Sequence, residues 1–169
     1  MSPAARAYIG LGANLAGIGG LAPRQTLDRA KAALSALPSS RLQATSRVYV
    51  SDPVESSGPP YVNQVARLQT ELQPLDLLDR LQSIERDFGR ERPHRNAPRT
   101  LDLDLLMLGD EQIDTPRLTL PHPRMHLRLF VLMPLAEMDP ALVIPGHGRV
   151  SERLAAVQAS QTQRCTPLD

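Results

Sequence analysis

Leucine alternates with aspartate across residues 101–105, near the middle of the chain. An alternation with period two is typical of a β-strand with one buried and one exposed face, so we expect the three leucines to point inward and Asp102 and Asp104 to point outward. The two carboxylates then share one face of the strand, about 6.6 Å apart. Because Asp is disfavoured in strands and like charges repel, a bound cation would remove the cost of this arrangement.

Carboxylate oxygens on a rigid strand suit Mg²⁺, which takes one or two protein carboxylates and completes its shell with water and substrate phosphates. Arg99, three residues before Asp102, adds a positive group that could hold a phosphate beside the same ion. A D-x-D pair is short and also occurs by chance, so a strand with a solvated acidic face is the competing interpretation.

The charge composition limits the classes of partner. The chain has 19 Lys and Arg residues against 18 Asp and Glu residues, so affinity for phosphate must come from local clusters and no nucleic-acid or membrane surface is expected. A single cysteine, Cys165, together with the lack of a signal layout or a long apolar run, predicts a cytoplasmic protein. At 169 residues we expect one domain, with a core over residues 6–157 and a polar C-terminal tail over residues 158–169.

The periodicity of apolar residues predicts the order of the elements. Intervals of three and four predict helices over residues 26–37, 74–88, 125–138 and 151–157. Alternation predicts strands over residues 7–12, 41–51 and 61–68, in addition to the aspartate strand. The first six of these elements follow the order β-α-β-β-α-β, which predicts an α+β fold, and the helix over residues 125–138 is expected to pack on the sheet.

Two glycines follow the first predicted strand and invite comparison with dinucleotide-binding sites. Gly10 and Gly12 would be the first two glycines of G-x-G-x-x-G, but the third position holds Leu15, so the fingerprint is absent. We interpret the pair as turn residues at the end of the strand, with a close approach of the backbone to another group as the alternative.

A strongly basic loop precedes the aspartate strand. Residues 90–99 contain four arginines, one histidine and two prolines, which predicts a polar, mobile loop. An isolated loop of this kind is usually solvated surface, but its position beside two carboxylates leads us to expect a lid over a metal-bound polyphosphate. A second polar face is expected where Arg117, Thr119 and His122 alternate with leucines.

Four motifs together resemble one known family. These motifs are Tyr8-Ile9-Gly10-Leu11-Gly12-Ala13-Asn14-Leu15, Tyr61-Val62-Asn63, Pro98-Arg99-Thr100-Leu101-Asp102-Leu103-Asp104-Leu105 and Leu120-Pro121-His122-Pro123-Arg124-Met125, followed by Arg128 and Phe130. The chain resembles the 6-hydroxymethyl-7,8-dihydropterin pyrophosphokinase family of folate biosynthesis over residues 6–150. The resemblance implies transfer of the β,γ-diphosphate of ATP to the pterin hydroxymethyl group, with release of AMP. It also implies a ferredoxin-like α+β core with a mainly antiparallel sheet and an additional C-terminal strand and helix.

The resemblance also implies roles for individual residues. Asp102 and Asp104 would hold two Mg²⁺ ions, and Arg90 and Arg92 would join them in catalysis. The ATP contacts would be Gln82, Glu85, Arg92, Arg99, Leu105, Arg117, Thr119, His122 and Arg128. The pterin would stack between Tyr61 and Phe130, and its polar edge would meet Asn63, Asp102 and backbone groups around Ser51 and Val54.

Two other functions are compatible with parts of this pattern. A Mg²⁺-dependent phosphodiesterase or nucleotidyltransferase could use the same carboxylate pair but would release different products. An RNA-binding module could share the β-α-β-β-α-β order, but such modules stack bases on aromatic residues of the central strands, where this chain has carboxylates and aliphatic side chains. We therefore expect small-molecule substrates, no nucleic-acid or membrane partner, and a monomer.

Overall fold

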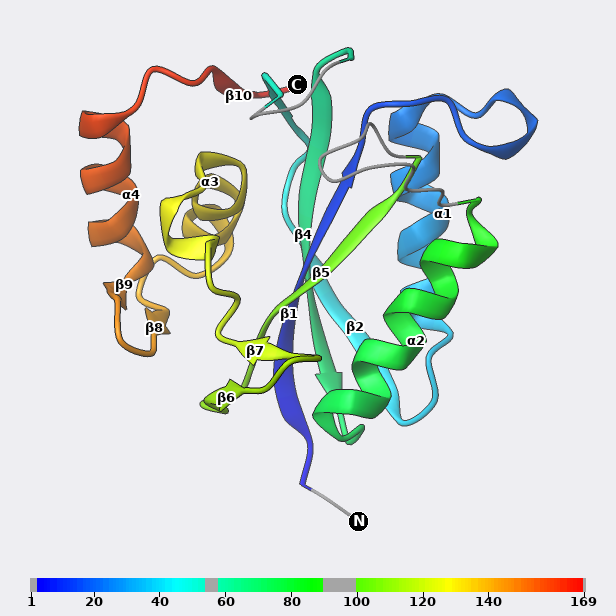
Figure 1. The fold of residues 1–169 in the computed structure, drawn as a ribbon, viewed down its shortest axis with the longest axis horizontal. Helices are drawn as coiled ribbons and strands as arrows, with labels where there is room; N and C mark the ends of the chain where they lie inside the picture. The colour runs from blue at the N-terminus through cyan, green and yellow to red at the C-terminus, as the bar shows by residue number, and fades with distance from the viewer. Residues whose placement is uncertain (1–2, 54–57, 90–99, 169) are drawn as a thin grey trace.

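The computed structural model describes residues 3–53, 58–89 and 100–168 and has an antiparallel sheet at its centre (Figure 1). The strands of this sheet are β1 (Ala5–Ala13), β2 (Ser40–Thr45), β3 (Tyr49–Ser51), β4 (Tyr61–Thr70), β5 (Asp102–Leu108) and β10 (Cys165–Pro167). Their order is β10-β3-β4-β1-β5, and β2 pairs with β4 next to the stretch that pairs with β3. All of these pairs are antiparallel. Because β5 comes last in this order, the strand that carries the aspartates lies at one edge of the sheet.

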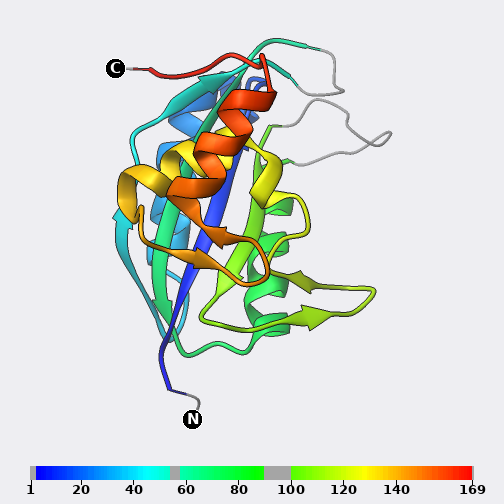
Figure 2. The same cartoon turned by 90° about the vertical axis from the view of Figure 1, so that its left-hand side faces the viewer.

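Helices cover both faces of the sheet (Figures 1 and 2). On one face lie α1 (Pro23–Ser35) and α2 (Pro74–Asp87), each with a proline in its first turn, where the missing N–H is not needed. On the other face, α3 (Leu129–Met138) packs on the sheet and α4 (Val150–Ser160) packs on α3. No helix in the described part of the chain has the length and hydropathy that crossing a bilayer would require.

Short elements complete the structure. They are the 3₁₀ turns η1 (Ile18–Gly20) and η2 (Met125–Leu127), the hairpin of β6 (Ile113–Asp114) with β7 (Thr119–Leu120), and the hairpin of β8 (Val143–Ile144) with β9 (Gly148–Arg149).

The alternation of side chains in β1 separates two hydrophobic clusters. Ala7, Ile9 and Leu11 are buried against α1 and α2, whereas Tyr8 points to the opposite face and packs with residues of α3 and α4. The leucines at 101, 103 and 105 belong to the first cluster and are at most 5% exposed, as their alternation with aspartate predicts. Burial of these leucines fixes the two aspartates on the α3 face of β5.

Two predicted elements are interrupted in the structure. The strand expected over residues 41–51 is divided into β2 and β3 at Ser46, whose N–H donates to the Val65 carbonyl oxygen and whose hydroxyl oxygen accepts from the Val65 N–H. The helix expected over residues 125–138 is divided at Arg128, whose backbone is extended (φ −111°, ψ 116°). The other helices and strands agree with their predicted ranges to within a few residues.

The C-terminal residues are more ordered than a polar tail. The helix predicted over residues 151–157 extends to Ser160, and Cys165–Pro167 forms β10, which pairs with β3. Hydrogen bonds from both ends of this segment to other parts of the chain hold it against the sheet.

Candidate active site

The two aspartates of β5 lie next to the two glycines of β1. The antiparallel register pairs Asp104 with Gly10 and Asp102 with Gly12, so no side chain from β1 fills the space beside either carboxylate. Asp102 and Asp104 are half-buried and both line one cleft, on the α3 face near the end of the sheet where β1 ends and β5 begins. The prediction that they share a face is confirmed.

The turn interpretation of the two glycines was wrong. Gly10 and Gly12 lie inside β1 and pair on both sides, with β4 and with β5. A Cβ at position 12 would lie 3.5 Å from Asn63 Oδ1 and 3.9 Å from the Tyr61 ring, inside the same cleft. The two glycines therefore form a floor of the cleft that carries no side chains, and a close approach of their backbone to another group stays a prediction.

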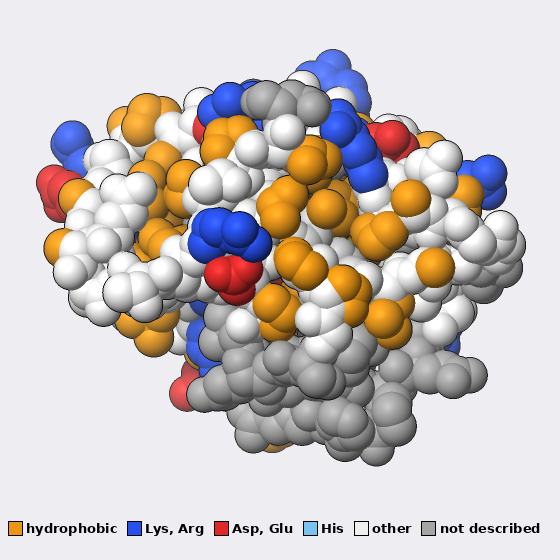
Figure 3. All heavy atoms as spheres, turned by 90° about the horizontal axis from the view of Figure 1, so that it is seen from above, with side chains coloured by type: hydrophobic (Ala, Val, Ile, Leu, Met, Phe, Trp, Pro, Cys, Tyr) orange, Lys and Arg blue, Asp and Glu red, His pale blue; other side chains and the backbone are white. Residues whose placement is uncertain are grey.

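The cleft has a volume of about 540 Å³ and brings together residues from distant parts of the chain. Of the residues predicted for the site, it is lined by Ser51, Tyr61, Asn63, Asp102, Asp104, Arg128 and Phe130. Seen from this end of the molecule, hydrophobic side chains are spread among backbone and uncharged polar atoms, with charged groups at several places (Figure 3).

One end of the cleft combines aromatic and polar groups. The Asn63 side chain is buried and donates a hydrogen bond from Nδ2 to Ser51 Oγ at 2.7 Å, which fixes the orientation of its amide. Tyr61 and Phe130 are half-buried and line the same cleft. The guanidinium carbon of Arg128 lies 5.5 Å from the centre of the Phe130 ring. This end can therefore accept a flat heterocycle that carries hydrogen-bonding groups at its edge.

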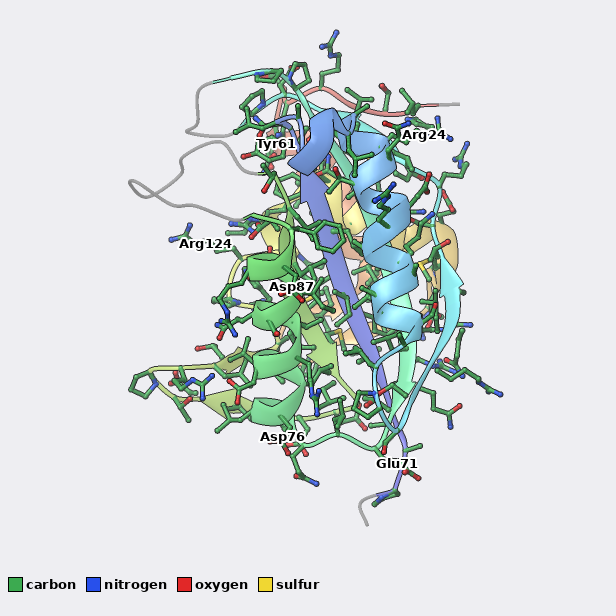
Figure 4. All side chains as sticks on the ribbon, turned by 90° about the vertical axis from the view of Figure 1, so that its right-hand side faces the viewer. Arg24, Tyr61, Glu71, Asp76, Asp87 and Arg124 are labelled. Carbon is green, nitrogen blue, oxygen red and sulfur yellow. The ribbon has the colours of Figure 1, made fainter. Side chains whose placement is uncertain are left out.

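Positive charge lies close to the acidic pair. Arg128 Nη1 is 3.9 Å from Asp104 Oδ2, a distance at the limit of an ion pair, and Arg124 also lines the cleft. Tyr61 and Arg124 lie toward the same end of the molecule, whereas Asp76 and Glu71 lie at the opposite end (Figure 4). The site therefore holds carboxylates next to guanidinium groups, as binding of a metal-bound polyphosphate requires.

His122 is neutral in this setting. Burial, together with the positive charges of Arg128 and Arg124, lowers the pKa of His122 to about 4, and the charge of Asp102 opposes the shift only in part. His122 Nδ1 accepts a hydrogen bond from the Arg124 N–H at 3.1 Å. The neutral ring therefore carries its proton on Nε2, which can donate to an anionic oxygen.

Several residues predicted to contact ATP do not line the cleft. Leu105 is buried in the core, and Arg117 forms an ion pair with Asp79 of α2. Thr119 lies in β7, and Gln82 is half-buried on α2.

Glu85 supports the aspartate strand. It is 2% exposed, and its Oε2 accepts a hydrogen bond from the Leu103 N–H at 2.8 Å. Leu103 lies between the two aspartates, so Glu85 fixes the backbone that carries both carboxylates. Four other predicted site residues, Val54, Arg90, Arg92 and Arg99, lie outside the described residues, as does the whole of the expected lid over residues 90–99.

The donor set of the acidic pair fits Mg²⁺. Two carboxylates on one strand can supply two oxygen ligands, and the glycine floor leaves space on their side of the sheet. Among the described residues, no group of three or more His, Cys, Asp or Glu side chains could hold a metal ion by itself. This donor set suits an ion that keeps water and substrate phosphates in its shell.

Sequence reasoning missed some residues that line the cleft. Arg124 stands in one of the motifs above but was given no role, and Leu127 and Val131 lie in the stretch predicted as a helix over residues 125–138 without being singled out. Residues 160–163 also line the cleft, although their sequence carries no pattern that would indicate it.

Known proteins provide an independent comparison. The profile of the 7,8-dihydro-6-hydroxymethylpterin-pyrophosphokinase (HPPK) family matches residues 8–140. A protein of Pseudomonas aeruginosa named 2-amino-4-hydroxy-6-hydroxymethyldihydropteridine pyrophosphokinase is 48% identical over 152 residues, which are 89% of this chain and 91% of that protein. A protein of the same name from Haemophilus influenzae is 46% identical over 147 residues, which are 86% of this chain and 89% of that protein.

Solved structures agree at the level of the fold, and the sequence relatives settle the family. The crystal structure of Plasmodium falciparum HPPK-DHPS with pteroate has a TM-score of 0.70 and 12% identity, covering 92% of this chain and 43% of that chain. The chain thus spans less than half the length of that protein, and the likeness shows the fold alone. Because the family profile matches most of the chain and close relatives match nearly all of it, the chain belongs to the 7,8-dihydro-6-hydroxymethylpterin-pyrophosphokinase family.

Proposed function

We propose that the cleft is the active site at which this chain transfers pyrophosphate from ATP to hydroxymethyldihydropterin in folate biosynthesis. The family and the names of the relatives support the reaction. One structural observation supports the location: the cleft brings Asp102 and Asp104 together with the Ser51–Asn63 hydrogen bond and two half-buried aromatic rings.

Pyrophosphate transfer depends on alignment of the reactants and neutralisation of charge on the phosphate oxygens, with little covalent help from the protein. Asp102 and Asp104 would hold Mg²⁺, two ions by the resemblance, together with the triphosphate of ATP. Bound Mg²⁺ would offset charge on the phosphate oxygens. Arg128 and the Nε2–H of His122 would donate to the same oxygens, and Arg90, Arg92 and Arg99 keep the phosphate contacts that the resemblance assigns to them.

The pterin end of the cleft would select the acceptor substrate. Stacking between Tyr61 and Phe130 would hold the flat ring, and the oriented amide of Asn63, with Ser51, Val54 and Asp102 nearby, would meet its polar edge. A site with polar groups matched to a substrate edge discriminates strongly against analogues that lack the matching groups. The hydroxymethyl group would then face the acidic pair.

The nucleotide would lie across the edge of β5. Its triphosphate would occupy the cleft beside Asp104 and Arg128, and its base and ribose would extend toward the β6–β7 hairpin, where Arg117 and Thr119 lie. Leu105 would contribute backbone groups only, because its side chain is 4% exposed. Gln82 and Glu85 on α2 would lie beneath this path.

The detailed topology of the fold is also proposed. The strand order β5-β1-β4, followed by β2 and β3, together with helices α1 and α2 on one face, supports a ferredoxin-like core. The single domain, the monomeric state, the cytoplasmic location and the lack of a nucleic-acid partner stay predictions from the sequence. The comparisons do not support a phosphodiesterase or a nucleotidyltransferase function, and they do not support RNA binding.

Product analysis tests the reaction directly. We expect the protein, incubated with ATP, Mg²⁺ and 6-hydroxymethyl-7,8-dihydropterin, to form AMP and pterin diphosphate in equal amounts, measured by anion-exchange chromatography. Release of inorganic phosphate or pyrophosphate without a pterin product would contradict the proposal and favour a phosphodiesterase or nucleotidyltransferase.

A further inference from the structure

The C-terminal part of the chain forms one wall of the cleft, although it lies outside the stretch that the family profile matches. The profile ends at residue 140, whereas Ser160, Gln161, Thr162 and Gln163 line the cleft. We call residues 161–168 the C-terminal strap, because they run from the end of α4 across to β3 (Figure 1).

The strap joins the two sides of the cleft by direct hydrogen bonds. On one side, Gln161 Nε2 donates to the carbonyl oxygen of Leu127 in η2 at 2.7 Å. On the other side, Gln163 Nε2 donates to the carbonyl oxygen of Asp52, just beyond β3, also at 2.7 Å. Leu127 is followed by Arg128, and Asp52 is preceded by Ser51, so each glutamine holds backbone next to a residue that lines the cleft.

Further contacts fix the strap to β3. The Asp52 N–H donates to the Arg164 carbonyl at 3.1 Å, and Arg164 Nη2 lies 3.1 Å from Asp52 Oδ1. Cys165 pairs with Ser51 in the sheet and is buried in the cluster below α3. Burial raises the pKa of this thiol to about 11, so Cys165 serves as an apolar anchor at neutral pH.

We propose that the C-terminal strap sets the geometry of the pterin end of the cleft, with Gln161 and Gln163 as positioning residues for the acceptor substrate. The proposal rests on the proposed function of the cleft. β3 has three residues, and Ser51 at its end accepts the hydrogen bond that orients Asn63. The position of a strand this short depends on hydrogen bonds with neighbouring segments. The bonds from the strap to Asp52 therefore hold the adjacent Ser51 in place, and Ser51 in turn holds the Asn63 amide.

The effect of Gln163 is confined to one end of the site. Gln163 acts on the β3 side, beside Ser51 and Asn63, whereas Asp102 and Asp104 are held by β1, by Glu85 and by the leucines of β5. Loss of the Gln163 bond should therefore weaken pterin binding and leave nucleotide binding unchanged. A single hydrogen bond to the backbone corresponds to a change of about fivefold in affinity.

Isosteric substitutions test this inference. Gln163→Met and Gln161→Met keep the length of each side chain and remove the amide donor, and Gln158→Met makes the same change at an exposed position of α4. Gln163→Lys restores a donor near Asp52. Pterin affinity is measured by calorimetric titration of 6-hydroxymethyl-7,8-dihydropterin into protein saturated with Mg²⁺ and a non-hydrolysable ATP analogue, and nucleotide affinity and the unfolding temperature are measured separately.

We expect Gln163→Met to raise the pterin Kd and KM by about fivefold, with kcat and nucleotide Kd unchanged and the unfolding temperature lowered by only about 2–4 °C. Gln163→Lys should restore affinity, Gln158→Met should match the wild type, and Gln161→Met, which releases the backbone beside Arg128, should weaken both pterin and nucleotide binding. Unchanged pterin affinity in Gln163→Met, or equal weakening of pterin and nucleotide binding in that variant, would overturn the inference. A wild-type protein that binds no pterin would instead overturn the proposed function, and the role of the strap with it.

Discussion

The two aspartates of β5 are held on one face of their strand by the leucines between and beside them, and their charges oppose this arrangement. Burial of three leucines outweighs the repulsion, and Arg128 near Asp104 offsets part of it. The alternation in the sequence therefore predicts the geometry of the pair, because hydrophobic burial determines which way the strand faces. The neighbouring glycines could not be interpreted from sequence alone, because their role depends on the register with β5.

Replacing one aspartate should separate stability from activity. We expect Asp104→Asn to leave the unfolding temperature in EDTA unchanged or slightly higher, since the substitution removes a charge beside Asp102. The same variant should lose at least about a hundredfold in kcat/KM, because it removes a ligand for the metal that accompanies the triphosphate. Thermal unfolding and steady-state kinetics measure the two effects. A large loss of stability with normal turnover would show a structural role instead.

The neutral state of His122 should make folding depend on pH. The pKa of His122 is about 4 in the folded protein, below the ordinary value of 6.5. Between these values the unfolded chain binds more protons, so this contribution to stability is complete above pH 6.5 and is lost as the pH falls toward 4.

Urea unfolding in EDTA at pH 7 and pH 4.5 tests the titration of His122. We expect His122→Asn, which cannot take up this proton, to lose less stability than the wild type between the two values, by about 1–3 kcal/mol. Parallel losses in the two proteins would exclude His122 as the titrating group.

At the level of whole elements, local pattern predicted most helices and strands, and it failed where single residues form bonds to distant parts of the chain. Ser46 interrupts the strand that became β2 and β3 by bonding to Val65 of β4, and Arg128 separates η2 from α3 by its extended backbone. Both breaks lie inside stretches whose apolar periodicity is continuous. The periodicity of apolar residues indicates which face of an element is buried, but it does not indicate where a single residue breaks the strand or the helix.

The attachment of α3 to the segment before β3 depends on one carboxylate. Glu137 of α3 accepts hydrogen bonds from the Arg47 N–H at 2.8 Å, from Arg47 Nε at 2.9 Å and from the Tyr49 hydroxyl at 2.7 Å. Partial burial acts to raise the pKa of Glu137, but these hydrogen bonds outweigh it and lower the pKa below its ordinary value. The stabilisation is therefore complete above the ordinary pKa and is lost as the pH falls through the lowered one.

Removal of this carboxylate should destabilise the protein. We expect Glu137→Ala to lower the free energy of unfolding by about 1–2 kcal/mol at pH 7, because three donors lose their acceptor. Chemical denaturation measures the change, with Glu111→Ala, at an exposed position after β5, as the matched control. Equal stability of the two variants would show that water replaces the lost bonds at no cost.

For the molecule as a whole, the family motifs predicted the acidic pair, the aromatic pair and the Ser51–Asn63 region, and the cleft unites them. The C-terminal wall could not be predicted, because it depends on contacts such as that between Gln163 and Asp52, which are 111 positions apart in the sequence. Contacts of this kind leave no local periodicity. The ATP contacts predicted on α2 and β7 are not among the residues that line the cleft, which a linear motif could not indicate.

Binding of a divalent ion to the protein–nucleotide complex tests the central claim, that the paired carboxylates hold the metal that accompanies the triphosphate. Mn²⁺ can replace Mg²⁺ as a probe, and electron paramagnetic resonance measures the free ion during titration in the presence of a non-hydrolysable ATP analogue. We expect Asp102→Asn and Asp104→Asn each to weaken Mn²⁺ binding by at least about tenfold, and Gln158→Met to leave it unchanged. Equal Mn²⁺ affinity in the wild type and in both aspartate variants would contradict a role of the carboxylates as metal ligands.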